Sequence, residues 1–233
     1  MNSLGDRMKR YERSSKDFLT PRTPVIIRVD GRAFHTYTKG MKKPFDENLI
    51  EAMTYASKKV AQDMQGFKVG YIQSDEASFL ITDYDDLNTQ GWFGYNLSKI
   101  ISITSSLMTA HFNEYMWRIN ATNEIAYFDA RAFNIPENDI PNYFLWRAQD
   151  WKRNSLQMYC RSFFSSKELH KKNHEDMHNM LHKIGRNWSK DLTDAEKNGT
   201  WIGYWNVMNP PIFTRRDILP MYDNMRVFIQ GLL

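Results

Sequence analysis

The sequence predicts an α+β protein built on a ferredoxin-like βαββαβ unit that covers residues 24–133. Three observations indicate this fold. Short apolar runs of strand length occur at residues 25–27, 69–72 and 77–81, and an alternating run occurs at 124–133. Helical apolar stripes follow the first strand and the third strand. The resulting order, strand-helix-strand-strand-helix-strand, is that of the split βαβ motif.

The first three elements are predicted in order along the chain. The β-branched run at 25–27 predicts a buried strand. Asp30 is expected to end this strand, and Gly31 to begin the turn that follows it. Asp46 is placed to cap the next helix, which has apolar residues at spacings of three and four up to Met64. Gly66 is expected to end that helix, and the second strand is expected at about 67–73.

The second half of the unit is predicted in the same way. A third strand is expected at about 77–82, a long core-facing helix at about 92–118 and a fourth strand at 124–133. Asp75 and Glu76 are expected at the tip of the hairpin between the second and third strands. Right-handed crossovers put the third strand between the first and the second. Asp30 and Asp75 are therefore predicted to meet at one edge of the sheet.

The flanking segments are predicted to be mainly helical. A short helix is expected within 5–17, capped by Ser3 or Asp6, and helices are expected across 136–187 with a capping box at Ser165 and Glu168. Residues 199–205 are read as a strand or hairpin arm. Pro210 and Pro211 are read as a break, Arg215 and Arg216 as a basic spot, and the apolar residues 226–233 as docking on the chain's own core or on a neighbouring subunit. We therefore expect a catalytic region at 1–135 and a helical C-terminal region at 136–233, packed together as one unit.

Composition limits the class of protein. The chain has 233 residues, 42% of them hydrophobic, and a net charge of +4, which permits a polyanionic partner without requiring one. Its one cysteine, Cys160, excludes an internal disulfide and is read as a buried thiol. No apolar run approaches the ~20 residues that a membrane span needs, and no signal peptide is seen at the start. We expect a soluble cytoplasmic protein.

Two carboxylates at one sheet edge are open to three interpretations: a general acid–base pair, a metal site or a structural cap network. A two-metal site for nucleotidyl transfer explains more of the neighbouring sequence. The turn 31–35 offers backbone N–H groups to phosphates, and the following loop offers the cations Lys39, Lys42 and Lys43. The histidines at 170, 174, 178 and 182 recur every four residues. They are read as surface groups that meet water or RNA rather than as a zinc site.

Several motifs together resemble the tRNA-His guanylyltransferase family and its bacterial and archaeal relatives. They are Met8-Lys9-Arg10-Tyr11-Glu12, residues 27–35, Lys42-Lys43-Pro44-Phe45-Asp46, Gln73-Ser74-Asp75-Glu76, Tyr127-Phe128-Asp129-Ala130-Arg131, and Trp146-Arg147 through Asn154-Ser155. The resemblance covers nearly the whole chain. It implies a polymerase-type palm and nucleotide addition in the 3′-to-5′ direction.

The resemblance also implies roles for residues. Asp30 and Asp75, with the Gly31 carbonyl, would hold two Mg²⁺ ions, and Glu76 would be the third catalytic carboxylate and would support the site. The nucleotide would be contacted by Gly31, Arg32, Ala33, Phe34, His35, Lys43, Asp46 and Ser74. Activation of the tRNA 5′ end would involve Lys152, Arg153, Asn154 and Ser155.

The chain departs from the family pattern at two places, and the first departure points to the bacterial-like branch. The motif at Lys152-Arg153-Asn154-Ser155 lacks the histidine with which eukaryotic members begin it, and Asn198-Gly199-Thr200 stands where the family often has Lys-Gly-Thr. The branch implies templated repair of 5′-truncated tRNA, with addition of GMP to tRNA-His as the other form of the reaction. ATP and GTP are the implied substrates, tRNA the implied partner and a homotetramer the implied assembly.

Two other classes remain as alternatives. A nucleotidyl cyclase with a similar palm uses the same metals in a homodimeric site. A catalytically silent RNA-binding homologue keeps the fold alone, and the presence of both Asp30 and Asp75 argues against it.

Overall fold

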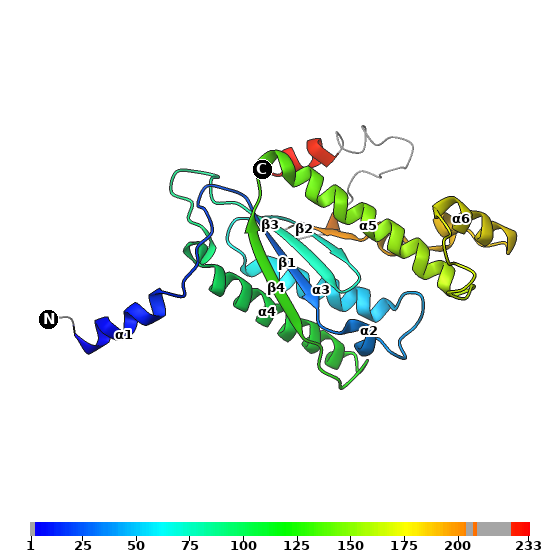
Figure 1. Ribbon diagram of the computed structural model, residues 1–233, viewed down its shortest axis with the longest axis horizontal. Coiled ribbons are helices and arrows are strands. Elements are labelled where there is room, and N and C mark those ends of the chain that lie inside the picture. Colours follow the sequence, from blue (N-terminus) through cyan, green and yellow to red (C-terminus); the bar gives the residue numbers. More distant parts are fainter. Residues whose placement is uncertain (1–2, 204–206, 209–224) are drawn as a thin grey trace.

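The predicted first strand is β1 (Val25–Gly31), which lies inside the sheet with its first three residues and Val29 buried. The computed structural model describes residues 3–203, 207–208 and 225–233. Within these residues the strands form one sheet with helices on both faces (Figure 1). The protein is thus a mixed fold of helices and an antiparallel sheet.

The order of the strands agrees with the crossover argument. β3 (Glu76–Ile81) lies between β1 and β2 (Phe67–Gln73) and is antiparallel to both, and β4 (Phe128–Asn134) pairs with the other side of β1. β5 (Thr200–Ile202) and β6 (Val207–Met208) extend the same sheet beyond β2, giving the order β4-β1-β3-β2-β5-β6. The predicted short C-terminal β element is therefore part of the main sheet.

Two long helices cover one face of the sheet. α3 (Glu47–Asp63) begins where predicted, with the Asp46 carboxylate accepting a hydrogen bond from the Leu49 N–H at 3.2 Å. α4 (Leu97–Arg118) packs beside it. Their buried side chains meet those of the strands in one apolar cluster, which includes Val25, Ile27, Phe79, Val60 and Phe112.

The other face is covered by α5 (Ile140–Arg161) and by residues 225–230, which are helical. Here Ile26 and Leu80 of the sheet pack with Phe144, Trp201 and Ile229. The apolar end of the chain therefore docks on its own core, one of the two outcomes expected. Figure 1 shows α5 running across the sheet, with the C-terminus beside its first turns.

A smaller cluster lies beyond the sheet, where α5 meets α6 (His174–Lys183), α7 (Trp188–Asp191) and α8 (Asp194–Asn198). Trp151, Cys160, Leu181 and Trp188 are buried there. Cys160 is a free, fully buried thiol, as predicted. His170 lies in the turn before α6, so the histidine series is only partly on one helix.

Two predicted boundaries were wrong. The long helix begins at Leu97 rather than at 92, because η1 (Trp92–Tyr95) contains left-handed residues and Asn96 caps the helix. The fourth strand begins at 128 rather than 124, because both backbone groups of Ala126 bond to the side chain of Asn113, at 2.9 Å each. That segment is tied to α4 and so is not paired with β1.

The remaining elements are short or peripheral. α1 (Leu4–Arg13) has the Ser3 cap and an Asp6 capping box, contains no buried residue and points away from the sheet in Figure 1. α2 (Phe34–Tyr37) follows β1, and η2 (Glu137–Asp139) precedes α5. The capping-box bonds of Ser165 and Glu168 are present in a turn rather than a helix. The predicted break at 210–211 and basic spot at 215–216 lie outside the described residues. None of the described helices has the length and apolar character needed to cross a bilayer.

Candidate active site

The two aspartates predicted to meet lie at one edge of the sheet. Asp30 is the penultimate residue of β1 and stands opposite Glu76 in the β1–β3 register. The Gly31 N–H donates to the Asp75 carbonyl at 3.0 Å, which fixes the end of β1 against the hairpin. Only Ser74 and Asp75 separate β2 from β3, and Ser74 has a φ of 51°. Such a left-handed serine is strained backbone of a kind that clusters at functional sites.

The negative charge at this edge is costly to hold. Burial raises the pKa of Asp75 above its usual range, and the charge of Asp30 raises it further, while a hydrogen bond from Ser74 lowers it. A cation near the two carboxylates favours their charged forms and so opposes both effects. The edge is therefore electrostatically suited to a bound metal ion or another positive group.

Glu76 has a different environment from the two aspartates. Its carboxylate contacts the Arg147 guanidinium at 3.4 Å and Arg28 at 3.8 Å. Burial raises the pKa of Glu76, and the two arginines oppose that shift. Arg147 also pairs with Asp150 at 2.6 Å, and Asp150 pairs with Arg153. Glu76 thus lies in a chain of alternating charges, Arg28–Glu76–Arg147–Asp150–Arg153, that links the sheet to α5.

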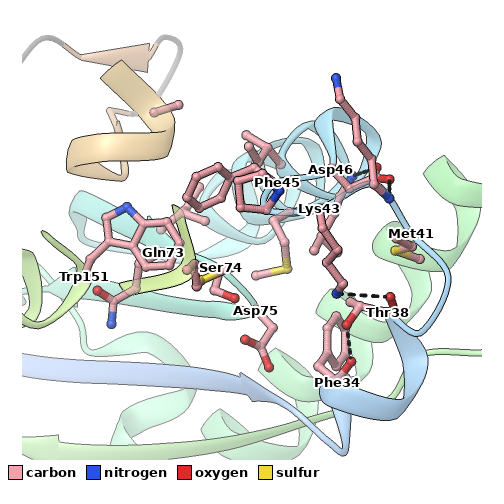
Figure 2. Close-up of a pocket in the computed structure, with 18 of the residues that line it drawn as sticks. Phe34, Thr38, Met41, Lys43, Phe45, Asp46, Gln73, Ser74, Asp75 and Trp151 are labelled. Atoms are coloured by element: carbon pink, nitrogen blue, oxygen red, sulfur yellow. Dashed lines mark hydrogen bonds between the residues drawn. The ribbon is translucent and has the colours of Figure 1, made fainter. Parts of the chain in front are cut away.

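A cavity of about 370 Å³ opens beside Asp75 (Figure 2). In Figure 2 the Lys43 side chain reaches across it toward α2, and its Nζ donates to the Thr38 carbonyl at 3.4 Å. The walls combine apolar side chains with several polar and charged ones, which suits a nucleoside. They include Phe34, His35, Met41, Phe45, Asp46, Gln73, Ser74, Asp75, Trp151 and Thr200.

A groove joins this cavity at its acidic end. Asp30 and Glu76 line only the groove, whereas Ser74 and Asp75 line both spaces. The far wall is one face of α5, where polar residues recur at spacings of three and four: Asp150, Asn154, Gln157 and Arg161. The predictions from the residues had not placed this face at the site, although its spacing was visible in the sequence.

The predicted nucleotide residues divide into two groups. Phe34, His35, Lys43, Asp46 and Ser74 line the cavity. Gly31, Arg32 and Ala33 do not line it, and Arg32 and Ala33 are exposed in the turn that leads to α2. Thr36 and Tyr37 donate to the Ala33 carbonyl, so the N–H groups of Phe34 and His35 come before the first bonds of α2 and have no acceptor within the helix.

Gly31 has a packing role that the sequence did not indicate. A Cβ at this position would lie 2.2 Å from the ring of Phe34, so a side chain cannot fit without moving that ring. Phe34 in turn packs against Phe112 and Phe128, with ring centroids 5.6 and 5.1 Å away. The absence of a side chain at Gly31 therefore lets the turn lie closely on the core.

The four residues predicted to act at the tRNA 5′ end point in different directions. Asn154 lines the groove, and Lys152 and Arg153 line a second cavity along a neighbouring face of α5. Ser155 is fully buried; its Oγ donates to the Glu196 carbonyl at 2.6 Å and accepts from Trp188 Nε1 at 3.0 Å. Ser155 holds α7 and α8 against α5, and it has no surface with which to contact RNA.

The donor set at the sheet edge fits magnesium. Carboxylate and carbonyl oxygens are its preferred ligands, and Mg²⁺ is usually held by one or two carboxylates together with substrate phosphates. In the described part of the chain no group of three or more His, Cys, Asp or Glu side chains is arranged to hold a metal. Two aspartates beside a nucleotide-sized cavity agree with an ion shared with a phosphate.

Comparisons with known proteins give one consistent match. The model of a family described as tRNAHis guanylyltransferase matches residues 5–136. A bacterial tRNA(His) guanylyltransferase-like protein solved in complex with ATP is 44% identical, with a TM-score of 0.86 over 94% of this chain and 99% of that chain. A structure of a bacterial tRNA(His) guanylyltransferase-like protein in complex with GTP is 38% identical, with a TM-score of 0.76 over 96% of this chain and 99% of that chain.

Among sequences, a probable tRNA(His) guanylyltransferase of Drosophila melanogaster is 30% identical over 146 residues, which are 60% of this chain and 49% of the fly protein. The chain thus spans about half the length of that relative.

Proposed function

Because the chain belongs to the tRNAHis guanylyltransferase family, we propose that it is a magnesium-dependent nucleotidyltransferase that adds nucleotides to the 5′ end of tRNA in the 3′-to-5′ direction. One observation supports this most directly: Asp30 and Asp75 lie at one sheet edge beside a cavity of nucleoside size. The similar bacterial structures in complex with ATP and GTP support the same two nucleotides as substrates here.

The βαββαβ core would be a ferredoxin-like, polymerase-type palm. The strand order β4-β1-β3-β2, with α3 and α4 on one face, supports this. Residues 1–135 would be the catalytic region, and residues 136–233 would pack on it as part of a single unit. α5 of the second region supplies a wall of the groove, which supports treating the two as one.

Magnesium would be held by Asp30, Asp75 and the carbonyl of Gly31, as two ions shared with the phosphates. When bound, it neutralises the charge that develops on the phosphorus oxygens. Glu76 would keep its arginine partners and hold the hairpin in place rather than bind metal. The N–H groups of Phe34 and His35, the Ser74 hydroxyl and Lys43 would meet the triphosphate, with Arg32 and Ala33 shaping the turn.

The base would lie in the apolar part of the cavity, near Phe45 and Met41. Asp46 uses its two carboxylate oxygens within the protein, accepting from the Leu49 N–H at 3.2 Å and the Lys42 N–H at 3.0 Å. It would therefore fix the shape of the loop beside the nucleotide.

The reaction would proceed in two displacements. A 5′-phosphate oxygen of the tRNA attacks the α-phosphorus of ATP and pyrophosphate leaves, so the 5′ end becomes adenylylated. The 3′-hydroxyl of the incoming nucleotide then attacks the 5′ phosphorus, and AMP leaves. Asn154 and Arg161 line the groove with the aspartates and would orient the 5′ end during both steps.

The proposed partner is tRNA, either tRNA-His or tRNA truncated at its 5′ end, and the bacterial-like motifs favour the truncated form. A homotetramer in the cytoplasm is the proposed assembly and location. The net charge of +4 agrees with an RNA partner.

The test is incorporation of a labelled nucleotide, with each nucleotide in turn, on 5′-truncated tRNA and on full-length tRNA-His. Asp30→Asn and Asp75→Asn should abolish Mg²⁺-dependent addition and leave tRNA affinity within about twofold. Asp63→Asn, an exposed change at the end of α3, is the matched control and should be as active as wild type. Addition by either site variant at the wild-type rate would contradict the metal assignment. Cyclic nucleotide formed from GTP or ATP alone would favour a cyclase.

A further inference from the structure

A second cavity, of about 540 Å³, lies along a face of α5 next to the one that lines the groove with the aspartates. It is lined by Trp146, Lys152 and Arg153 of α5, by two histidines of α6, His174 and His178, and by Trp188 of α7. The carboxylate chemistry described above uses none of these side chains. The regular histidine spacing noted in the sequence places His174 and His178 along this wall.

The lining combines aromatic surfaces with cations. Trp146 is 53% exposed, so its ring presents an apolar surface to the cavity. Its ring is held by the Arg147 guanidinium, 4.1 Å from the ring centroid. Lys152 Nζ lies 5.9 Å from the centre of the Trp188 ring, and that ring also meets His178 edge to face. Fixed aromatic rings beside cationic groups are the usual platform for unpaired nucleotides.

The cavity is adjacent to the catalytic groove. Asp150 lines both spaces and separates them. It is fixed by ion pairs with Arg147 on one side and Arg153 on the other. An RNA chain whose 5′ end lies in the groove therefore passes within one helix diameter of the cavity.

We propose that this cavity, which we name the α5–α6 cavity, binds the unpaired 3′-terminal nucleotides of the tRNA acceptor end. The inference rests on the proposed function. In a tRNA the 5′ end pairs with the strand that continues into the single-stranded 3′ end, so an enzyme that acts on one must accommodate the other. Trp146 would stack on a base, and Arg153 would contact the phosphate that follows it.

A single strand suits the cavity better than a free nucleoside triphosphate does. The lysine and arginine side chains that line the cavity are Lys152 and Arg153. Asp150 forms an ion pair with Arg153 and so neutralises one of these two positive charges. A triphosphate would bring more negative charge than the lining can neutralise. An RNA strand brings one phosphate per nucleotide and a base for each aromatic surface.

The test compares the full chain's affinity for tRNA with an intact 3′ end and for the same tRNA lacking its unpaired 3′ nucleotides. Wild type should bind the intact tRNA about 5- to 150-fold more tightly, the range expected for one stacked base. Trp146→Ala should remove this preference, and Trp146→Phe should restore most of it. Arg153→Gln should weaken binding of the intact tRNA and reduce its dependence on salt.

GTP affinity should be unchanged in all three variants. Trp117→Ala, a change of the same type at a similarly exposed residue of α4, is the control and should keep the preference. Equal binding of both tRNAs by wild type, or equal weakening of both by Trp146→Ala, would overturn the proposal. Failure of the proposed function appears separately, as absence of nucleotide incorporation by wild type on every tRNA, whatever the binding results.

Discussion

The alternating charges that link the sheet to α5 predict strong coupling between Glu76 and Arg147. Their side chains are 14% and 6% exposed and their charged atoms are 3.4 Å apart. Replacing Arg147 by Met keeps most of the packed stem and removes the charge. Glu76 then stays buried with only Arg28, at 3.8 Å, as a cationic neighbour. Loss of one partner of a buried pair costs about 3–5 kcal/mol, and the remaining Arg28 contact places this variant near the lower end, at about 3 kcal/mol.

The assay is urea unfolding of a double-mutant cycle. Glu76→Gln alone should lower the free energy of unfolding by about 1–3 kcal/mol, since Arg147 keeps its 2.6 Å contact with Asp150. The double variant should cost less than the sum of the two single changes by at least about 1 kcal/mol. Arg131→Met is the control. Its pair with Asp129 is 3.5 Å apart but 53% and 62% exposed, so its loss should cost under about 1 kcal/mol. Additivity within about 0.5 kcal/mol at Glu76 and Arg147 would refute the reasoning.

Three further predictions concern packing and reactivity. Gly31→Ala should lower the free energy of unfolding by about 1–3 kcal/mol, because the new methyl would lie 2.2 Å from a core aromatic ring. Thermal unfolding measures this loss against the control Gly5→Ala, where the nearest atom is 3.7 Å away. Equal stability of the two variants would contradict the prediction. Ser155→Ala should cost about 1–3 kcal/mol by leaving the Trp188 N–H without its acceptor, as measured by urea unfolding; a change below about 0.5 kcal/mol would mean that the bond is unimportant. Cys160 is fully buried, and burial also raises its pKa to about 11. Its thiol should therefore react with a disulfide reagent at pH 8 only when the protein unfolds, and rapid labelling of the native state would disprove this.

Local patterns predicted the framework of the site. The strand-length apolar runs and the right-handed crossover rule were enough to place Asp30 and Asp75 at one sheet edge, and the register of β1 and β3 agrees. The cap of α3 by Asp46 also followed from residue type and position. These features depend on periodicity and chain connection, which a sequence displays directly.

Features that depend on long-range packing were not predictable in this way. Ser155 lies within a polar stretch of sequence but is buried by α7 and α8, which arrive more than 30 residues later along the chain. The late start of β4, at Phe128, depends on one asparagine of α4, Asn113. The polar face of α5 had the right spacing, yet only the tertiary fold aims it at the groove rather than at solvent.

The pairing of β5 with β2 has a consequence for synthesis of the protein. β2 leads into the turn that carries Ser74 and Asp75, and its outer edge is covered by Thr200–Ile202. Thr200 also lines the proposed nucleotide cavity. Nascent chains form structure from the N-terminus onward, so a ribosome-bound intermediate would hold both aspartates while β2 was paired with β3 but still lacked β5 on its outer edge. Competence to bind nucleotide would therefore arise late in translation, once the strand at 200–202 has left the ribosome and closed the sheet.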